Sequence, residues 1–155
     1  IDCWENEPDP DPELLEMVAF ATPHIDGYSR DGKANGTRTA VHAVSRFFGL
    51  GIDDGEPPGV ELPADPLIEL EGRGRDQAAT LAEAILATYE IERDDAALRK
   101  DPGLFDQLRG DYPVRREFGA YSIRAAGVGS GTLSKLAALG FGIIGRQNDP
   151  GDSDK

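Results

Sequence analysis

The chain has 155 residues, the size of one ordinary domain or of parts of two small ones. Its 16 Lys and Arg stand against 29 Asp and Glu, a net charge of −13, and this balance argues against a nucleic-acid partner. The longest nearly unbroken apolar run, residues 136–145, is half the roughly 20 residues that a membrane-spanning helix needs, so we expect no membrane association. The single cysteine, Cys3, excludes an internal disulfide and a cysteine-built zinc site. We therefore predict no metal and a reducing, cytoplasmic location.

The first 29 residues form an acidic segment with eight Asp and Glu and no Lys or Arg. Because the chain starts at Ile1 rather than at Met, we expect it to begin within a longer protein. Prolines interrupt regular structure up to residue 12. A helical turn over 13–17 and a short buried strand over 18–21 are predicted to follow. The loop after that strand, Thr22-Pro23-His24, is where chemistry is expected.

A long helix is predicted next, because apolar side chains recur at three- and four-residue spacing from Ala34 to Phe48. Ser29 is suited to cap its start and Gly49 to end it, which gives about five turns. Residues 51–66 are rich in Gly, Pro and acidic residues, so we interpret them as a linker that follows a first domain over 1–50.

The second half of the chain is predicted to contain both strands and helices. In the first helix, Ala78, Ala82 and Leu86 are among the apolar residues that we expect to be buried. This part of the chain should form a small α+β domain of about three strands over 67–145, with a disordered tail over 146–155. Its expected elements are a strand over 67–71, an amphipathic helix over 77–90, a short helix capped by Asp94 or Asp95 that runs to Arg99, a turn over 104–108, a strand over 117–125, a helix over 132–139 and a strand over 141–144.

A run of glycines, Gly127, Gly129 and Gly131, lies between a predicted strand and a predicted helix and resembles a phosphate-binding turn. The third glycine of a dinucleotide fingerprint would fall at Thr132, and too little chain remains for the sheet of such a fold. We therefore interpret the run as a flexible loop.

Glu7 and His24 are the candidate acid–base pair. An imidazole titrates near neutrality, and a neighbouring carboxylate favours its charged form, so such a pair can accept and return a proton. Taken alone, the two residues are better explained as a solvated acid and a loop histidine. The strings around them change this interpretation.

Two strings, IDCWENEP at Ile1–Pro8 and ATPHIDGYS at Ala21–Ser29, closely resemble the D-isomer-specific 2-hydroxyacid dehydrogenases. The resemblance implies an α/β enzyme with a Rossmann-type nucleotide domain, of which this chain holds only the last strands, and NAD as cofactor. It also implies site roles: His24 as acid and base, Glu7 as the acid that orients it, Asp2 near the nicotinamide carboxamide and Gly27 in close backbone approach to the cofactor. Asp26 departs from the family pattern, because it adds a negative charge beside His24.

A narrower resemblance, carried by the strings at 27–37, 89–100 and 105–117, is to a branch of that family with an added C-terminal dimerisation domain. It implies a homodimer that oxidises a phosphorylated hydroxy acid to the 2-oxo acid in pyridoxal 5′-phosphate biosynthesis, with Tyr28 contacting the substrate. The cofactor's glycine-rich loop and the arginine for the substrate carboxylate should lie upstream of Ile1. We therefore expect the chain by itself neither to bind NAD tightly nor to turn over substrate.

Two alternatives remain open at this point. The chain could come from another 2-hydroxyacid dehydrogenase, such as a phosphoglycerate dehydrogenase with a C-terminal regulatory domain, although Tyr28 and the strings DDAALRK and YPVRRE count against it. Alternatively, the chain could act only as a dimerisation module.

Overall fold

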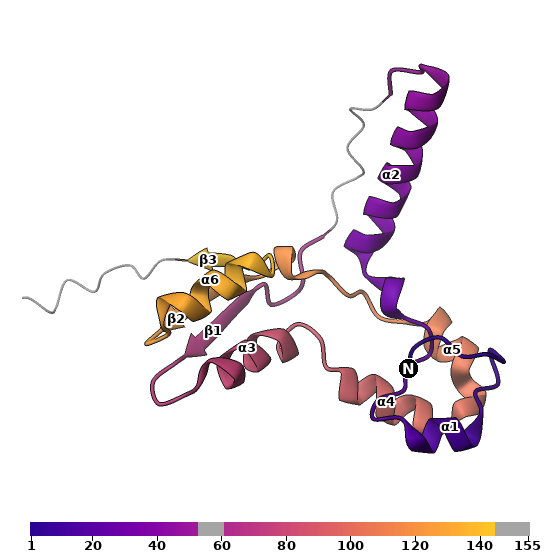
Figure 1. Cartoon of the computed structure of the whole chain (residues 1–155), viewed down its shortest axis with the longest axis horizontal. Helices are drawn as coiled ribbons and strands as arrows, with labels where there is room; N and C mark the ends of the chain where they lie inside the picture. Colours follow the sequence, from indigo (N-terminus) through magenta and orange to yellow (C-terminus); the bar gives the residue numbers. More distant parts are fainter. Residues whose placement is uncertain (53–60, 145–155) are drawn as a thin grey trace, which may run out of the picture. The chain divides into compact units, whose positions relative to one another are not determined.

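The computed structural model describes residues 1–52 and 61–144, and the described residues fall into two compact units (Figure 1). Unit 1 combines the described residues of 1–61 with 90–115, and unit 2 combines those of 62–89 with 116–155. Residues 90–115 therefore pack with the N-terminal part of the chain, although they lie inside the domain expected over 67–145. The division into a first domain, a linker and a dimerisation domain stays a prediction. Half of the linker, residues 53–60, and the whole tail over 146–155 lie outside the described residues.

Unit 2 is built on a parallel sheet of three strands in the order β1 (Leu67–Glu71), β2 (Ser122–Ala126) and β3 (Gly142–Ile144). Unit 2 also contains the helices α3 (Gln77–Leu86) and α6 (Ser130–Ala138). Parallel strands need crossover connections, and α6 supplies the one between β2 and β3. The expected number of strands is confirmed, and their parallel pairing makes the unit a small mixed α/β structure.

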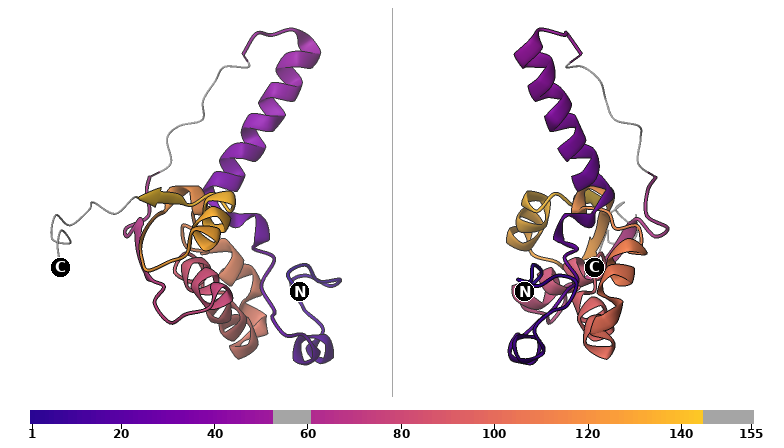
Figure 2. Two further views of the ribbon diagram at one scale, coloured as in Figure 1. Left: turned by 60° about the vertical axis from the view of Figure 1, so that its left-hand side comes forward. Right: turned by 90° about the vertical axis from the view of Figure 1, so that its right-hand side faces the viewer.

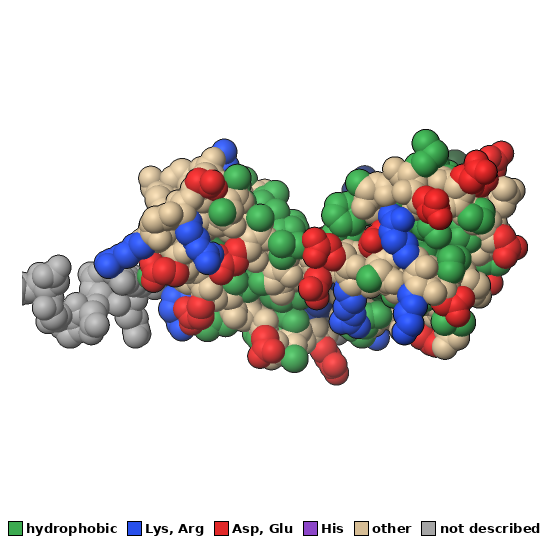
Figure 3. Space-filling view, turned by 90° about the horizontal axis from the view of Figure 1, so that it is seen from below, with side chains coloured by type: hydrophobic (Ala, Val, Ile, Leu, Met, Phe, Trp, Pro, Cys, Tyr) green, Lys and Arg blue, Asp and Glu red, His purple; other side chains and the backbone are tan. Residues whose placement is uncertain are grey.

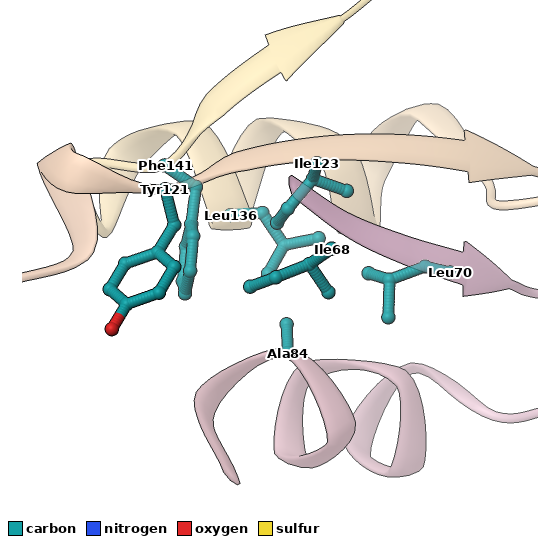
Figure 4. Close-up of a cluster of buried hydrophobic side chains, with 7 residues drawn as sticks. All are labelled: Ile68, Leu70, Ala84, Tyr121, Ile123, Leu136 and Phe141. Carbon is teal, nitrogen blue, oxygen red and sulfur yellow. The ribbon is translucent and has the colours of Figure 1, made fainter. Parts of the chain in front are cut away.

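The core of unit 2 lies between the sheet and its helices (Figure 4). Alternation along β1 buries Ile68 and Leu70, as the strand pattern predicts. Ala84 points from α3 toward these strand residues, and Ile123 of β2 lies above them. The buried members of the cluster are Ile68, Leu70, Ala84, Tyr121, Ile123, Leu136 and Phe141.

Two predicted elements of unit 2 are too long. The helix expected over 77–90 ends at Leu86. Its buried residues are Thr80 and Ala84, whereas Ala78, Ala82 and Leu86, which were expected to be buried, are exposed. The strand expected over 117–125 starts only at Ser122, after the 3-10 turn η3 (Phe118–Ala120). The reason is the register, because Ser122 pairs with the first residue of β1 and earlier residues have no β1 partner opposite them.

One glycine of the run, Gly127, is closely packed, whereas a Cβ added at Gly129 would meet nothing within 4 Å. Gly127 has a φ of 67°, which favours glycine, and a Cβ added at Gly72 would lie 2.7 Å from the carbonyl oxygen of Gly127. The two turns at the ends of β1 and β2 therefore approach each other closely. This packing accounts for Gly72 and Gly127 without a phosphate ligand.

Unit 1 contains helices from both of its chain segments around a small apolar core. The helices and 3-10 turns are α1 (Pro12–Met17), η1 (Asp26–Tyr28), α2 (Arg30–Phe48), α4 (Ile91–Lys100), η2 (Pro102–Leu104) and α5 (Phe105–Gly110). The buried core residues are Trp4, Leu15, Ala21, Leu98 and Phe105. The predicted turn over 13–17 is confirmed in α1, and the turn over 104–108 lies in η2 and α5.

Helix α2 is confirmed with both of its predicted ends. The Ser29 hydroxyl accepts a hydrogen bond from the Gly32 amide at 2.9 Å, and Gly49 ends the helix in the left-handed conformation. Its apolar stripe is uncovered, since Val41, Val44 and Phe48 are exposed, and Figure 2 shows the helix projecting from the rest of its unit. In the described part of the chain, no helix has both the length and the apolar character to cross a membrane.

The strand predicted over 18–21 is wrong, because side chains of α4 take the place of a neighbouring strand. The Ala21 amide donates to the Asp95 carboxylate at 2.7 Å, and Arg99 donates to the carbonyl oxygens of Leu15 and Val18. The predicted capping role of Asp94 or Asp95 is also wrong, since both lie inside α4, which begins at Ile91.

Candidate active site

The site begins where the N-terminal segment lies against the loop over 21–25. The Trp4 indole N–H donates to the Thr22 carbonyl oxygen at 2.9 Å in a buried position, and the Thr22 amide donates to the Ile1 carbonyl oxygen at 3.0 Å. These bonds place residue 7 beside residue 24. The buried Trp4 side chain and these hydrogen bonds therefore bring the two strings together, although they are separated in the sequence.

Glu7 and His24, the predicted pair, are in direct contact. The Nδ1 atom of His24 lies 2.9 Å from Oε1 and 2.8 Å from Oε2 of Glu7. An ionised carboxylate can only accept hydrogen bonds, so Nδ1 carries the proton and Nε2 is the nitrogen that can exchange one with a ligand. The His24 side chain is 40% exposed and that of Glu7 is 22% exposed, so the imidazole is accessible while its partner is sheltered.

Two hydrogen bonds and a nearby cation favour the ionised form of Glu7. The Trp4 amide donates to Oε1 at 2.9 Å and is the main reason that the pKa of Glu7 is held below its ordinary value. The hydrogen bond from His24 lowers this pKa further, and the positive charges of His24 and Arg109 add to the effect. Glu7 is therefore a carboxylate at neutral pH.

This lowered pKa predicts how a Glu7→Gln variant responds to acid. A carboxyl group whose pKa is depressed by folding contributes stability above its ordinary pKa, here 4.5, and loses it as the pH falls through the lowered value. Glu7→Gln should therefore be less stable than the parent at pH 7, with the difference shrinking below pH 4.5. Urea unfolding at a series of pH values measures it. A difference that does not change with pH would contradict the carboxylate's role.

Asp2 holds the loop that carries His24. Its carboxylate accepts from the Thr22 hydroxyl at 2.7 Å, the Ile25 amide at 2.8 Å and the Asp26 amide at 3.0 Å. Burial opposes ionisation of Asp2, but these hydrogen bonds outweigh it and lower its pKa. His24 itself has a φ of 55°, a conformation that such bonds on both sides stabilise. Asp2 thus positions the loop, and its contact with a nicotinamide stays a prediction.

Gly27 lies in η1, one turn before α2. A Cβ added there meets nothing within 4 Å, and its φ lies outside the region that only glycine favours. Neither packing nor backbone conformation in the described structure requires a glycine at this position. The open space beside Gly27 is therefore compatible with the close approach of a cofactor.

Gly27→Ala tests that interpretation. The variant should keep its thermal stability, because the added methyl has room. If NAD approaches Gly27 as the family resemblance implies, the KM for NAD of the whole polypeptide should rise about 10-fold from overpacking against the cofactor. Gly36→Ala is the matched control, since its Cβ also meets nothing within 4 Å. An unchanged KM in Gly27→Ala would exclude the close approach.

Tyr28, the predicted substrate contact, is surrounded by cations that the sequence analysis missed. The Lys33 ammonium lies 3.9 Å from the centre of the Tyr28 ring, and the Arg109 guanidinium carbon lies 5.7 Å from it. The Tyr112 ring packs edge-on at 6.0 Å. Lys33 follows Tyr28 closely in sequence, but nothing local indicated that α5 would bring Arg109 to this ring.

Arg115 connects the same loop to the segment after α5. Its guanidinium donates to the carbonyl oxygens of Ile25 at 3.2 Å and Asp26 at 2.6 Å. The Arg30 amide in turn donates to the Arg115 carbonyl oxygen at 2.9 Å. Arg115 therefore supports the His24 loop. Asp26, the departure from the family pattern, is exposed and enters this network through its backbone.

Comparison with known proteins gives one family and a consistent set of relatives. The family model described as "Domain of unknown function (DUF3410)" matches residues 62–140. Curated proteins named erythronate-4-phosphate dehydrogenase are similar to most of the chain. The one from Bacteroides fragilis is 52% identical over 123 residues, 79% of this chain and 32% of the relative. The one from Teredinibacter turnerae is 40% identical over 147 residues, 92% of this chain and 38% of the relative.

The chain thus spans about a third of the length of the relatives that it matches. The narrower resemblance found in the sequence, to the branch with an added C-terminal domain, is confirmed by these relatives.

Proposed function

The chain belongs to the DUF3410 family, and from that premise we propose that it is the C-terminal portion of an NAD-dependent dehydrogenase. The proposed reaction is the oxidation of 4-phospho-D-erythronate to its 2-oxo acid, in pyridoxal 5′-phosphate biosynthesis. The hydrogen-bonded Glu7–His24 pair carries the proposal, because oxidation of a hydroxyl group needs a positioned base. The names of the relatives support the substrate.

His24 accepts the proton of the substrate hydroxyl at Nε2 during oxidation and returns one during reduction. Glu7 keeps Nδ1 protonated and holds the ring, as the two short contacts to its carboxylate require. NAD, when bound, supplies the hydride acceptor, and Gly27 and Asp2 are the residues of this chain proposed to lie near it. Tyr28 contacts the substrate.

The experiment is an assay of the whole polypeptide, followed by the absorbance of NADH. Turnover of 4-phospho-D-erythronate well above that of 3-phosphoglycerate supports the proposal, and the reverse preference would favour a phosphoglycerate dehydrogenase. The 155-residue chain assayed alone should show neither activity, because the residues expected to bind the dinucleotide and the substrate carboxylate are not in it. NADH formation by this chain alone would contradict that expectation.

Unit 2 is proposed to mediate a homodimer. In its described sheet, β1 and β3 are edge strands, and an edge strand presents backbone groups that a second copy can cover. Apolar side chains are exposed nearby, including Leu67 on β1 and Ile143 on β3. Burial against a second subunit would explain why these exposed side chains are apolar.

Ile143→Glu should therefore weaken the dimer. A buried carboxylate at a subunit contact has a large desolvation cost, so sedimentation equilibrium of the whole polypeptide should show the dissociation constant rising at least about 10-fold. Met17→Glu, at an exposed position of α1, is the control and should leave it unchanged. A parent protein that stays monomeric at tens of micromolar would contradict the proposal.

A further inference from the structure

The cations around Tyr28 form a group that the acid–base mechanism does not use. Lys33, from the first turns of α2, and Arg109, from α5, both lie against the Tyr28 ring. Arg115 lies 5.8 Å from the Tyr112 ring, but its guanidinium already donates to two loop carbonyls. Lys33 and Arg109 are therefore the two members whose charge is directed toward Tyr28. We refer to Lys33, Arg109 and Tyr28 as the Tyr28 cluster.

Arg109 shows a feature that points to a ligand. Its Nε is buried and has no hydrogen-bond partner in the described structure. Buried N–H groups nearly always have an acceptor, and His42 Nε2 on α2 also lacks one, so an unpartnered nitrogen alone does not identify a site. Arg109 differs from His42 because its guanidinium also lies against the Tyr28 ring, which makes it the candidate for a ligand contact. Guanidinium groups bind phosphate through several parallel N–H donors.

Charge balance points to the same chemistry. The segment over 1–29 holds eight acidic residues and no Lys or Arg, so by itself it would repel a phosphorylated substrate. Lys33 and Arg109 come from outside that segment and bring positive charge to it, near enough for Arg109 to stabilise ionised Glu7. On the face drawn in Figure 3, basic side chains likewise lie among acidic ones rather than in a separate field.

We propose that the Tyr28 cluster binds the phosphate group of the substrate, with Arg109 as the principal ligand and Lys33 as the second cation. The Tyr28 ring holds both cations by cation–π contact, which keeps their charged ends together. The inference rests on the proposed function for the identity of the substrate. It adds that the specificity for a phosphorylated hydroxy acid comes from α5 and the start of α2.

The first experiment compares two substrates of the whole enzyme, 4-phospho-D-erythronate and D-erythronate, which lacks the phosphate. Arg109→Gln should raise the KM for the phosphorylated substrate about 10- to 100-fold, the range for a lost charge-assisted contact, and leave kcat within a few-fold. It should leave kcat/KM for D-erythronate nearly unchanged. Lys33→Gln should act in the same direction, and Arg109→Lys should recover part of the loss because it keeps the charge.

Arg46→Gln is the matched control. It removes a positive charge from the same helix as Lys33, but 13 residues further along α2, about 20 Å away and beyond the Debye length at physiological salt. Both substrates should be unaffected. If Arg109→Gln instead lowers kcat equally for both substrates, Arg109 acts through Glu7 and the proposal is wrong. An equal rise in both KM values would assign the cluster to the carboxylate that the substrates share and would also overturn it.

The second experiment is independent of turnover. Inorganic phosphate titrated into the whole polypeptide should shift the NMR signals of the Tyr28 ring and of the Arg109 Nε–H, and Arg109→Gln should abolish the Tyr28 shift. The NMR shifts can be observed even if the enzyme does not oxidise 4-phospho-D-erythronate. The proposed reaction can therefore be disproved while the phosphate site is supported. Turnover of that substrate without any response to phosphate, and with an unchanged KM in Arg109→Gln, would refute the phosphate site alone.

Discussion

His24→Asn should lower the kcat of the whole enzyme by about 10²- to 10⁴-fold, the contribution typical of a positioned general acid–base group. Asparagine can keep a hydrogen bond to Glu7, but it has no group that accepts a proton near neutral pH. The loss should therefore appear in kcat rather than in KM, because the binding contacts of the loop remain. Initial rates over a range of substrate concentrations measure both constants.

His42→Asn is the control for this variant, since His42 is the other histidine of the chain and lies on α2. Its kcat should stay close to that of the parent. Glu7→Gln should behave differently from both variants. It should mainly shift the acidic limb of the pH–rate profile and retain more of kcat than His24→Asn does. The reason is that Glu7 orients the imidazole but does not itself exchange the substrate proton. Near-normal turnover in His24→Asn would contradict the assignment of His24 as the acid–base residue.

Arg99→Met should reduce the free energy of unfolding by about 3 kcal/mol, in the range for breaking a partly buried, hydrogen-bonded ion pair. Arg99 donates to the Asp95 carboxylate at 2.8 and 3.0 Å and to the carbonyl oxygens of Leu15 and Val18. Methionine fills similar space but donates no hydrogen bond. The variant therefore leaves Asp95 without its cation and two carbonyl oxygens without their donor.

Urea unfolding at pH 7 measures this change, and Arg93→Met provides the comparison. Arg93 lies on the same helix, is exposed and should change the free energy of unfolding by no more than about 0.5 kcal/mol. Equal effects of the two substitutions would mean that the bonds from Arg99 do not hold the N-terminal segment. Because that segment leads into the loop of His24, Arg99→Met should also lower activity at temperatures where the protein is still folded.

Local signals in the sequence determined the elements whose stability depends on near neighbours. Ser29 and Gly49 mark the ends of α2 because capping satisfies backbone groups within one turn. Residues 67–71 have the predicted strand bounds because alternating burial is a property of the strand itself. The Glu7–His24 pair was predictable because both residues lie in strings that resemble one family.

Only the tertiary structure decided which distant segments meet. Residues 18–21 have the composition of a strand, but their backbone groups bond to Asp95 and Arg99 of α4, more than 70 residues away. Arg109 reaches Tyr28 for the same reason, because residues 90–115 pack with the N-terminal segment rather than with the sheet that precedes and follows them. Hydrophobic periodicity reports which face of an element is buried and not what covers it, so neither contact could be inferred before the packing was known.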